Sequence, residues 1–183
     1  MIIYIHGFGS SGSGGKATLF REKFQEDILL PSLSYVPTLA IDTLEQLIKL
    51  LINKNEKISL VGSSLGGYYS IYLANKYNLK AVLINPAITP YTTLDKIGMA
   101  TNYFDLTTFE VTKEHIQMLK KLEVNLIKKQ ENFMVLLQKD DDVCPYLKAV
   151  EKLPNSTLHI EEGGSHTFDG IERYFESIEQ FFK

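Results

Sequence analysis

The feature that most constrains the fold is a glycine-rich segment between a strand-like and a helix-like pattern. Residues 58–61 form a short apolar run typical of a buried strand, and residues 66–77 have the spacing of a helix. Between them stands Gly62-Ser63-Ser64-Leu65-Gly66, which fits the pattern G-x-S-x-G. A serine raised on so tight a turn crowds the positions two residues before and after it, so those positions need glycine. The segment therefore predicts a strand–turn–helix unit with Ser64 at the turn.

Ser64 is a candidate nucleophile because of where this unit places it. The N-terminus of a helix has free backbone N–H groups and a positive dipole end, and both favour a developing negative charge. The alternative is a glycine-rich turn without a catalytic role. Residues elsewhere in the chain that could act together with Ser64 distinguish these two interpretations.

The rest of the chain alternates between strand and helix patterns, which indicates a parallel sheet covered on both faces. Strands are expected at residues 2–6, 28–30, 58–61, 80–84, 133–137 and 157–160. Helices are expected at residues 16–27, 38–53, 66–77, 145–153 and 171–182. With 183 residues, the chain is expected to form one domain, 1–183. The predicted fold class is α/β, a three-layer arrangement with a six-stranded parallel sheet flanked by helices.

The alternation is lost between residues 88 and 131. This section is rich in aromatic residues, among them Tyr91, Tyr103, Phe104 and Phe109, and it has one helical stretch at 112–124. A long insertion between two strands is a common place for a lid or a substrate pocket. We therefore expect residues 88–131 to form a lid or cap over the site.

A serine nucleophile needs a general base and a third group that orients the base. His166 is the best candidate for the base, because it lies in a glycine-containing loop directly after a predicted strand. The acid should leave the preceding strand, so that the chain order is Ser, Asp, His. Three consecutive aspartates follow that strand. Asp141 is preferred because Val143 and Pro145 would anchor the turn behind it, and Asp142 is the second choice.

The oxyanion hole of such a site requires two backbone N–H groups. One should come from Leu65, the residue after the nucleophile, and the other from Phe8, in the loop after the first strand. His6, at the end of that strand, is interpreted as a structural residue that shapes the loop. Cys144 does not lie on a tight strand-to-helix turn (an elbow) like that of Ser64, and no histidine is predicted beside it. It is therefore interpreted as a small buried residue.

The loop from Gly7 to Lys16 also resembles two nucleotide-binding motifs, and both matches are weak. Gly7-Phe8-Gly9-Ser10-Ser11-Gly12 fits G-x-G-x-x-G, but the residues that follow oppose a helix start at the third glycine. In a comparison with the P-loop, Ser10 replaces the first glycine, and Ala17 replaces the hydroxyl that should bind magnesium.

Charge and composition exclude several other classes of protein. A net charge of −3 provides no basic surface for nucleic acid and no polybasic membrane signal. The single cysteine excludes an internal disulfide framework, and no apolar run is long enough to span a membrane. The start of the chain lacks the features of a signal peptide. We therefore expect a cytoplasmic protein without nucleic-acid or membrane partners.

Five segments in chain order resemble the small bacterial YqiA/YcfP-type esterases of the α/β-hydrolase superfamily. They are Tyr4-Ile5-His6-Gly7-Phe8, Gly62-Ser63-Ser64-Leu65-Gly66-Gly67-Tyr68-Tyr69, Asn85-Pro86-Ala87, Leu136-Leu137-Gln138 with Asp141, and Glu162-Gly163-Gly164 with His166 and Phe168. The resemblance implies a reduced α/β-hydrolase fold and a serine esterase with a Ser–Asp–His triad and no cofactor. Asp140 and Ser165 depart from the family pattern, and residues 88–131 match it poorly.

The residues and the resemblance together predict a serine hydrolase that cleaves a small acyl ester or thioester. Ser64, Asp141 and His166 would form its triad, Phe8 and Leu65 its oxyanion hole, and neither a metal nor a cofactor is required. One alternative is a binding protein that keeps the fold without turnover. A second is a phosphate- or nucleotide-binding protein that uses the loop from Gly7 to Lys16.

Overall fold

The structure is a computed structural model that describes residues 1–96 and 98–183. Six parallel strands form one sheet in the order β2-β1-β3-β4-β7-β8. They are β1 (Ile2–Ile5), β2 (Ile28–Leu29), β3 (Ser59–Ser63), β4 (Lys80–Ile84), β7 (Phe133–Gln138) and β8 (Thr157–Glu161). The predicted parallel sheet is therefore confirmed. β3 ends two residues later than predicted, directly before Ser64.

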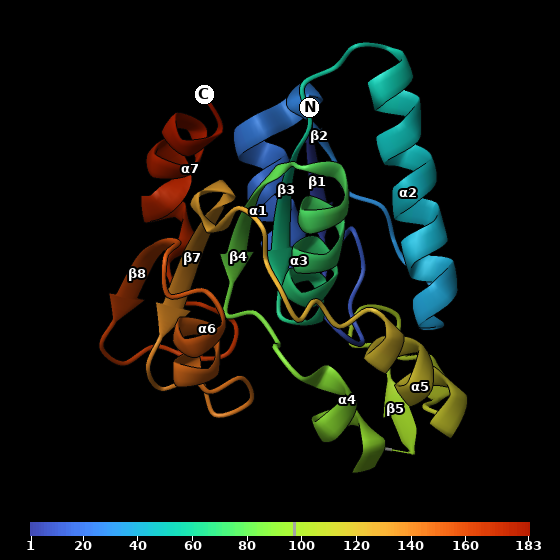
Figure 1. Cartoon of the computed structure of the whole chain (residues 1–183). Helices are drawn as coiled ribbons and strands as arrows, with labels where there is room; N and C mark the ends of the chain where they lie inside the picture. Colours follow the sequence, from blue (N-terminus) through green and yellow to red (C-terminus); the bar gives the residue numbers. More distant parts are fainter. Residues whose placement is uncertain (97) are drawn as a thin grey trace.

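Helices cover both faces of this sheet, which confirms the three-layer α/β fold class (Figure 1). They are α1 (Gly15–Phe24), α2 (Pro37–Asn53), α3 (Leu65–Tyr77), α6 (Tyr146–Lys152) and α7 (Phe175–Phe182). Two predicted helices are divided, because 3₁₀ turns at Gln25–Asp27 and Ile171–Tyr174 adjoin α1 and α7. Among the described residues, no helix combines the length and the apolar character needed to cross a membrane.

The sheet is buried on both faces because its strands carry apolar residues at consecutive positions. Successive side chains of a strand point to opposite faces, so neighbours in sequence belong to different cores. Ile3 and Leu60 are buried in the core that includes residues of α2 and α3. Tyr4 and Val61 are buried in the core that includes residues of α1 and α7. Together the two cores hold the strand ends, and thus the site, in a fixed arrangement.

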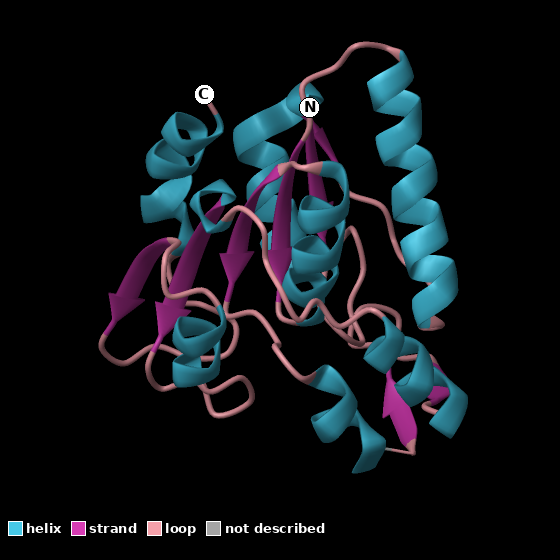
Figure 2. Ribbon diagram, in the orientation of Figure 1, coloured by secondary structure: helices cyan, strands magenta, loops and turns pink. Residues whose placement is uncertain are grey.

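Residues 88–131 contain more regular structure than the sequence pattern indicated. They form α4 (Pro90–Thr93), β5 (Met99–Thr101), β6 (Thr108–Glu110), α5 (Lys113–Lys121), and 3₁₀ turns at Leu94–Lys96 and Gln130–Asn132. β5 and β6 pair as an antiparallel hairpin, which the sequence did not predict. The helix expected at 112–124 is shorter: α5 begins at Lys113, after the cap formed by Thr112 and His115, and ends at Lys121. In Figure 2, α4, β5 and α5 lie beyond the carboxyl ends of the main strands.

Candidate active site

Ser64 occupies a strained turn between β3 and α3. Its backbone has φ 54° and ψ −118°, a conformation that L-residues rarely adopt. The flanking glycines explain how the turn is accommodated. A Cβ atom on Gly62 would overlap the carbonyl group of Gly66, and a Cβ atom on Gly66 would overlap the carbonyl oxygen of Ile5. The chain therefore needs glycine at both positions to raise Ser64 at the carboxyl edge of the sheet.

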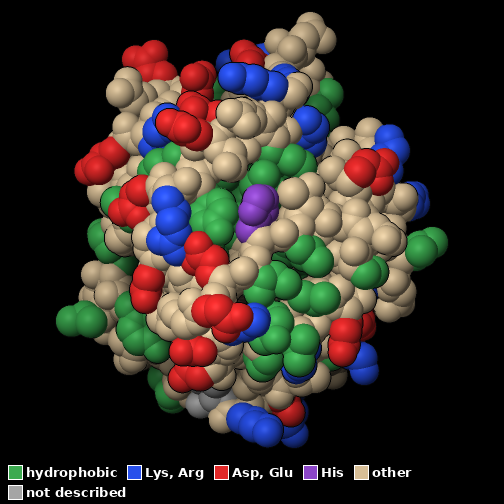
Figure 3. All heavy atoms as spheres, turned by 90° about the vertical axis from the view of Figure 1, so that its left-hand side faces the viewer, with side chains coloured by type: hydrophobic (Ala, Val, Ile, Leu, Met, Phe, Trp, Pro, Cys, Tyr) green, Lys and Arg blue, Asp and Glu red, His purple; other side chains and the backbone are tan. Residues whose placement is uncertain are grey.

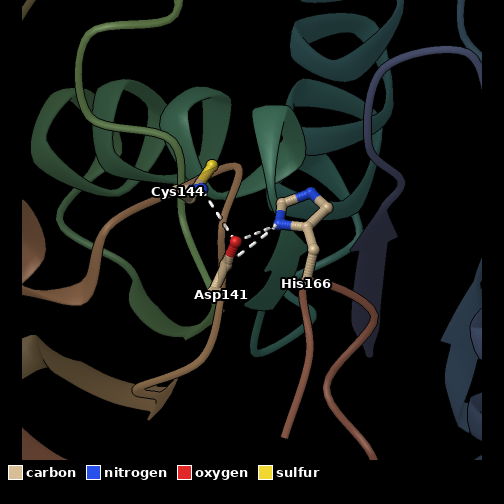
Figure 4. A group of neighbouring side chains, drawn as sticks. All are labelled: Asp141, Cys144 and His166. Carbon is tan, nitrogen blue, oxygen red and sulfur yellow. Dashed lines mark hydrogen bonds and ion pairs between the residues drawn. The ribbon is translucent and has the colours of Figure 1, made fainter.

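The three residues predicted for the triad form a hydrogen-bonded chain in which His166 contacts both Ser64 and Asp141. The Oγ atom of Ser64 is 3.0 Å from Nε2 of His166. The Nδ1 atom of His166 is 2.9 Å from each carboxylate oxygen of Asp141 (Figure 4). An ionised carboxylate only accepts hydrogen bonds, so Nδ1 carries the proton and Nε2 is left to accept the serine O–H. The geometry is that of a nucleophile, a base and an orienting acid.

Asp141 is the one of the three consecutive aspartates that faces the histidine. It is 4% exposed, whereas Asp140 and Asp142 are exposed. Its Oδ1 accepts hydrogen bonds from the backbone N–H groups of Val143 and Cys144, at 2.9 and 2.7 Å. This turn fixes the carboxylate at the end of β7, so the structure favours Asp141 over Asp142 as the partner of His166.

Two buried amide side chains, Asn85 and Gln138, position the loop that carries His166, a role that was not predicted from the sequence. Asn85 donates to the carbonyl oxygens of Ser165 and His166, at 2.8 and 3.3 Å, and accepts from the N–H of Gln138. Gln138 accepts from the N–H groups of Ser165 and Asp169. These side chains tie the histidine loop to the ends of β4 and β7. The available sequence signal was the segment Asn85-Pro86-Ala87 directly after a strand.

We expect Asn85→Gly to lower kcat for the ester hydrolysis predicted from the sequence about tenfold, and to lower the free energy of unfolding by about 1–3 kcal/mol because buried partners lose their hydrogen bonds. Glycine is chosen because Asn85 has φ 40°, which glycine adopts without strain. Asn55→Gly is the matched control, since Asn55 has φ 56° and is exposed. Steady-state rates and urea unfolding provide the comparison. Equal effects in both variants would show that Asn85 does not position the loop.

The two residues predicted to supply the oxyanion-hole N–H groups are close to Ser64 in the chain or in the fold: Leu65 follows Ser64, and Phe8 follows Gly7, which packs against Ser64. Among the described residues, neither Phe8 nor Leu65 donates its backbone N–H to a hydrogen bond. Gly7 brings the β1 loop against the elbow, since a Cβ atom at Gly7 would lie 3.2 Å from Cβ of Ser64. Both donors thus remain available next to the serine, and their role in stabilising an oxyanion stays a prediction.

His6 behaves as the predicted structural residue. Its Nε2 atom accepts the N–H of Leu33 at 2.9 Å, and its Nδ1 atom lies 2.8 Å from the carbonyl oxygen of Gly7. Burial lowers the pKa of this imidazole, although the hydrogen bond to Gly7 acts in the opposite direction. The neutral His6 side chain therefore holds the loop that contains Phe8 in place through its hydrogen bonds to Gly7 and Leu33.

Cys144 differs from the prediction, because it is half-buried and lies beside the triad. Ligand atoms of Asp141, Cys144 and His166 lie within 4.8 Å of one another, so the three could in principle hold a metal ion. Burial, followed by the nearby Asp141 charge, raises the pKa of the Cys144 thiol to about 12. A metal ligand must be a thiolate, so this environment fits a hydrogen-bonded triad better than a metal centre.

Two clefts adjoin Ser64, and both are also lined by Phe8, Tyr103 and His166. We call them the apolar cleft and the Lys16 cleft. The apolar cleft has a volume of about 490 Å³, and its apolar lining includes Leu65, Ala87, Pro90, Leu94, Met99 and Val143. The Lys16 cleft has a volume of about 560 Å³, and its lining includes Tyr4, Lys16, Leu19, Ser63, Phe168 and Asp169. Figure 3 shows hydrophobic side chains gathered beside and below an exposed histidine, with charged side chains around them.

The six-stranded parallel sheet, its helical layers and the serine elbow define the α/β-hydrolase fold class, and comparisons with known structures agree. Alpha/beta hydrolase domain-containing protein 10 from mouse has a TM-score of 0.73 at 18% identity, with 98% of this chain and 88% of that chain covered. The monoacylglycerol lipase from Paleococcus ferrophilus has a TM-score of 0.70 at 16% identity, with coverage of 99% and 93%.

The sequence comparisons identify the family within this class. The model of "Uncharacterised protein family (UPF0227)" matches residues 1–183, and the chain belongs to that family. The UPF0227 protein YcfP of Salmonella paratyphi A is 26% identical over 189 residues, covering 99% of this chain and 98% of the relative. The predicted resemblance to YcfP-type proteins is therefore confirmed, while the esterase activity that it implied stays a prediction.

Proposed function

We propose that this protein is a serine hydrolase that cleaves carboxylic esters or thioesters through an acyl-enzyme intermediate. The observation that carries the proposal is the alignment of Ser64, His166 and Asp141 at a strained elbow. The Oγ–Nε2 distance is 3.0 Å, and Nδ1 lies 2.9 Å from the Asp141 carboxylate. A serine with only a structural role would not require a strained backbone, a histidine base at its hydroxyl and a carboxylate behind that histidine.

In the proposed reaction, Ser64 Oγ attacks the ester carbonyl carbon while Nε2 of His166 takes the hydroxyl proton. Asp141 holds the imidazole in the required tautomer and stabilises its positive charge. The N–H groups of Phe8 and Leu65 bind the oxyanion. His166 then protonates the leaving oxygen or sulfur as the bond to the carbonyl carbon breaks. Water attacks the acyl-enzyme by the same route, with His166 again as the base.

The apolar cleft suits the uncharged part of a small ester, and residues 88–131 supply much of its lining. In the proposal, this section acts as the lid or cap of a single catalytic domain. A lipase among the proteins of similar fold supports an ester substrate, although fold alone does not assign it. The reaction needs no cofactor or metal, and a cytoplasmic location remains the expectation.

The direct test is turnover of 4-nitrophenyl esters from acetyl to octanoyl. We expect a burst of about one nitrophenol per chain before the steady state, because acylation releases the alcohol before water enters. The absence of both a burst and turnover across the series would favour a binding protein that keeps the fold without catalysis. Thermal stabilisation by nucleotides, also without turnover, would favour the nucleotide-binding alternative.

Tyr103 is the aromatic residue of the insertion that we expect to affect chain-length preference. It lines both clefts beside Ser64, whereas Phe109 stacks against Tyr35, and the hydroxyl of Tyr91 donates to Glu123. Apolar contact contributes about 0.8 kcal/mol per buried methylene. Tyr103→Ala should therefore reduce kcat/KM about tenfold for octanoyl esters and less than about twofold for acetyl esters.

The control for this prediction is Phe104→Ala. Phe104 is next in sequence and, like Tyr103, is exposed, but it does not line either cleft. It should leave the ratio of octanoyl to acetyl rates unchanged. Equal losses on all chain lengths in Tyr103→Ala would place the acyl-binding surface elsewhere.

A further inference from the structure

Lys16 occupies an unusual position beside the candidate nucleophile. It is the second residue of α1 and is half-buried, and its Nζ atom donates to Oγ of Ser63 at 2.8 Å. Ser63 immediately precedes Ser64, so the ammonium lies close to the turn that carries the nucleophile. Among the residues that the structure describes, Lys16 takes part in no ion pair. The proposed reaction makes no use of this charge.

A half-buried lysine with a single protein partner is energetically costly. An ammonium group has three donors, and the only hydrogen bond from the Lys16 side chain to another described residue is the one to Ser63. Burial lowers the pKa of Lys16 to about 8, although the charges of Asp141 and Asp169 act in the opposite direction. Because Lys16 lines a cleft, a molecule bound there can accept hydrogen bonds from its remaining donors.

The acidic residues of the same cleft do not neutralise Lys16 by direct contact. Oδ1 of Asp169 accepts hydrogen bonds from Ser165 and Thr167, so its carboxylate is oriented towards its own loop. Glu172 is exposed. The positive charge therefore lies close to the turn of Ser64, while of the two carboxylates that line the cleft, Asp169 is engaged within its own loop and Glu172 is exposed to solvent.

We propose that the ester cleaved at Ser64 carries an anionic group, a carboxylate or a phosphate, that binds Lys16 in the Lys16 cleft. This inference rests on the proposed function and specifies its substrate class. The two clefts share Phe8, Ser64, Tyr103 and His166, so one molecule held at Ser64 can extend into both. Its uncharged part lies in the apolar cleft. In this proposal the loop from Gly7 to Lys16, which resembles nucleotide-binding motifs, forms part of the site for the anionic group, because Gly7, Ser10 and Gly15 also line the Lys16 cleft.

The test compares charged and neutral esters of similar size on each side of the scissile bond. For the acyl side, the 4-nitrophenyl monoester of succinic acid is paired with 4-nitrophenyl pentanoate. For the leaving-group side, 4-acetoxybenzoate is paired with its methyl ester, and 4-acetoxyphenyl phosphate tests phosphate. The quantity measured is the ratio of kcat/KM for the charged ester to kcat/KM for the neutral one, in which general effects on the catalytic machinery cancel.

Lys16→Met should lower this ratio by about 10- to 100-fold in at least one pair, because a hydrogen bond to a charged group is lost. The pair that responds identifies the side of the ester that carries the anion. Lys23→Met is the matched control, since Lys23 lies on the same helix and its ion pair is with Glu179 of α7. It should leave the ratio unchanged.

An unchanged ratio in every pair for Lys16→Met would overturn the inference and would assign Lys16 to holding Ser63. Turnover of the neutral esters would then still support the proposed function, so the two failures are distinguishable. If Lys16→Met does not fold, inhibition of the unaltered protein decides the question. Succinate and 4-hydroxybenzoate should compete better than their methyl esters, and equal inhibition by the charged and uncharged compounds would contradict the proposal.

Discussion

Ser64→Ala is expected to lower kcat for ester hydrolysis by about 10⁴- to 10⁶-fold. The hydroxyl is the only group at the elbow that lies within hydrogen-bond distance of the base, at 3.0 Å from Nε2 of His166, among the residues that the structure describes. Without it no acyl-enzyme can form. The remaining rate would reflect water held near His166 and the two N–H donors.

Ser63→Ala provides the comparison for this prediction. The hydroxyl of Ser63 accepts from Lys16 and is buried, so it belongs to a different set of contacts from the hydroxyl of Ser64. It should lower the rate on uncharged esters by no more than about tenfold, the effect of one hydrogen bond. Steady-state assays with matched far-ultraviolet spectra separate loss of chemistry from loss of fold. A loss in Ser63→Ala as large as that in Ser64→Ala would contradict the assigned nucleophile.

Asp141→Asn should lower kcat by about 10³- to 10⁴-fold while leaving the fold intact. The amide oxygen of asparagine can still accept from the N–H groups of Val143 and Cys144, so the turn after β7 keeps its hydrogen bonds. The amide NH₂ would then face Nδ1 of His166, which favours the tautomer that leaves Nε2 protonated. Such a histidine cannot take the proton of Ser64.

The neighbouring aspartates are controls in the same loop. Asp140 and Asp142 are exposed, so Asp140→Asn and Asp142→Asn should each cost about tenfold or less, because exposed charges contribute little. Kinetics of all three variants on one short-chain ester, with unfolding measured in parallel, give the comparison. If Asp142→Asn were the most damaging change, the acid would be one residue further along the chain.

The elbow could be predicted from the sequence because its cause is local. The turn at Ser64 leaves no room for a Cβ atom at positions 62 and 66, so both must be glycine, and this requirement is visible in the sequence. The partners Asp141 and His166 were also accessible, since both follow strands of a parallel sheet and carboxyl ends of such strands meet at one edge. What the sequence left open was the choice among three aspartates, which depends on which carboxylate the turn buries.

The features that sequence reasoning missed depend on contacts between distant segments. β5 and β6 are three residues each, too short for a reliable alternating pattern, and they form only because they pair with each other. Asn85 contacts residues about eighty positions away, so nothing next to it indicates its hydrogen bonds to the histidine loop. Lys16 appeared within a weak nucleotide motif, and only the fold places it beside Ser63.

The measurement that tests the central claim most directly is covalent labelling with a fluorophosphonate, followed by peptide mapping. Among the residues described, only Ser64 has its hydroxyl within hydrogen-bond distance of a histidine ring that a carboxylate orients. One label per chain on Ser64, greatly slowed in Asp141→Asn, is the result that we predict. A label on Ser63 or Cys144, or no label on a folded chain that still hydrolyses esters, would contradict the assignment of Ser64 as the nucleophile.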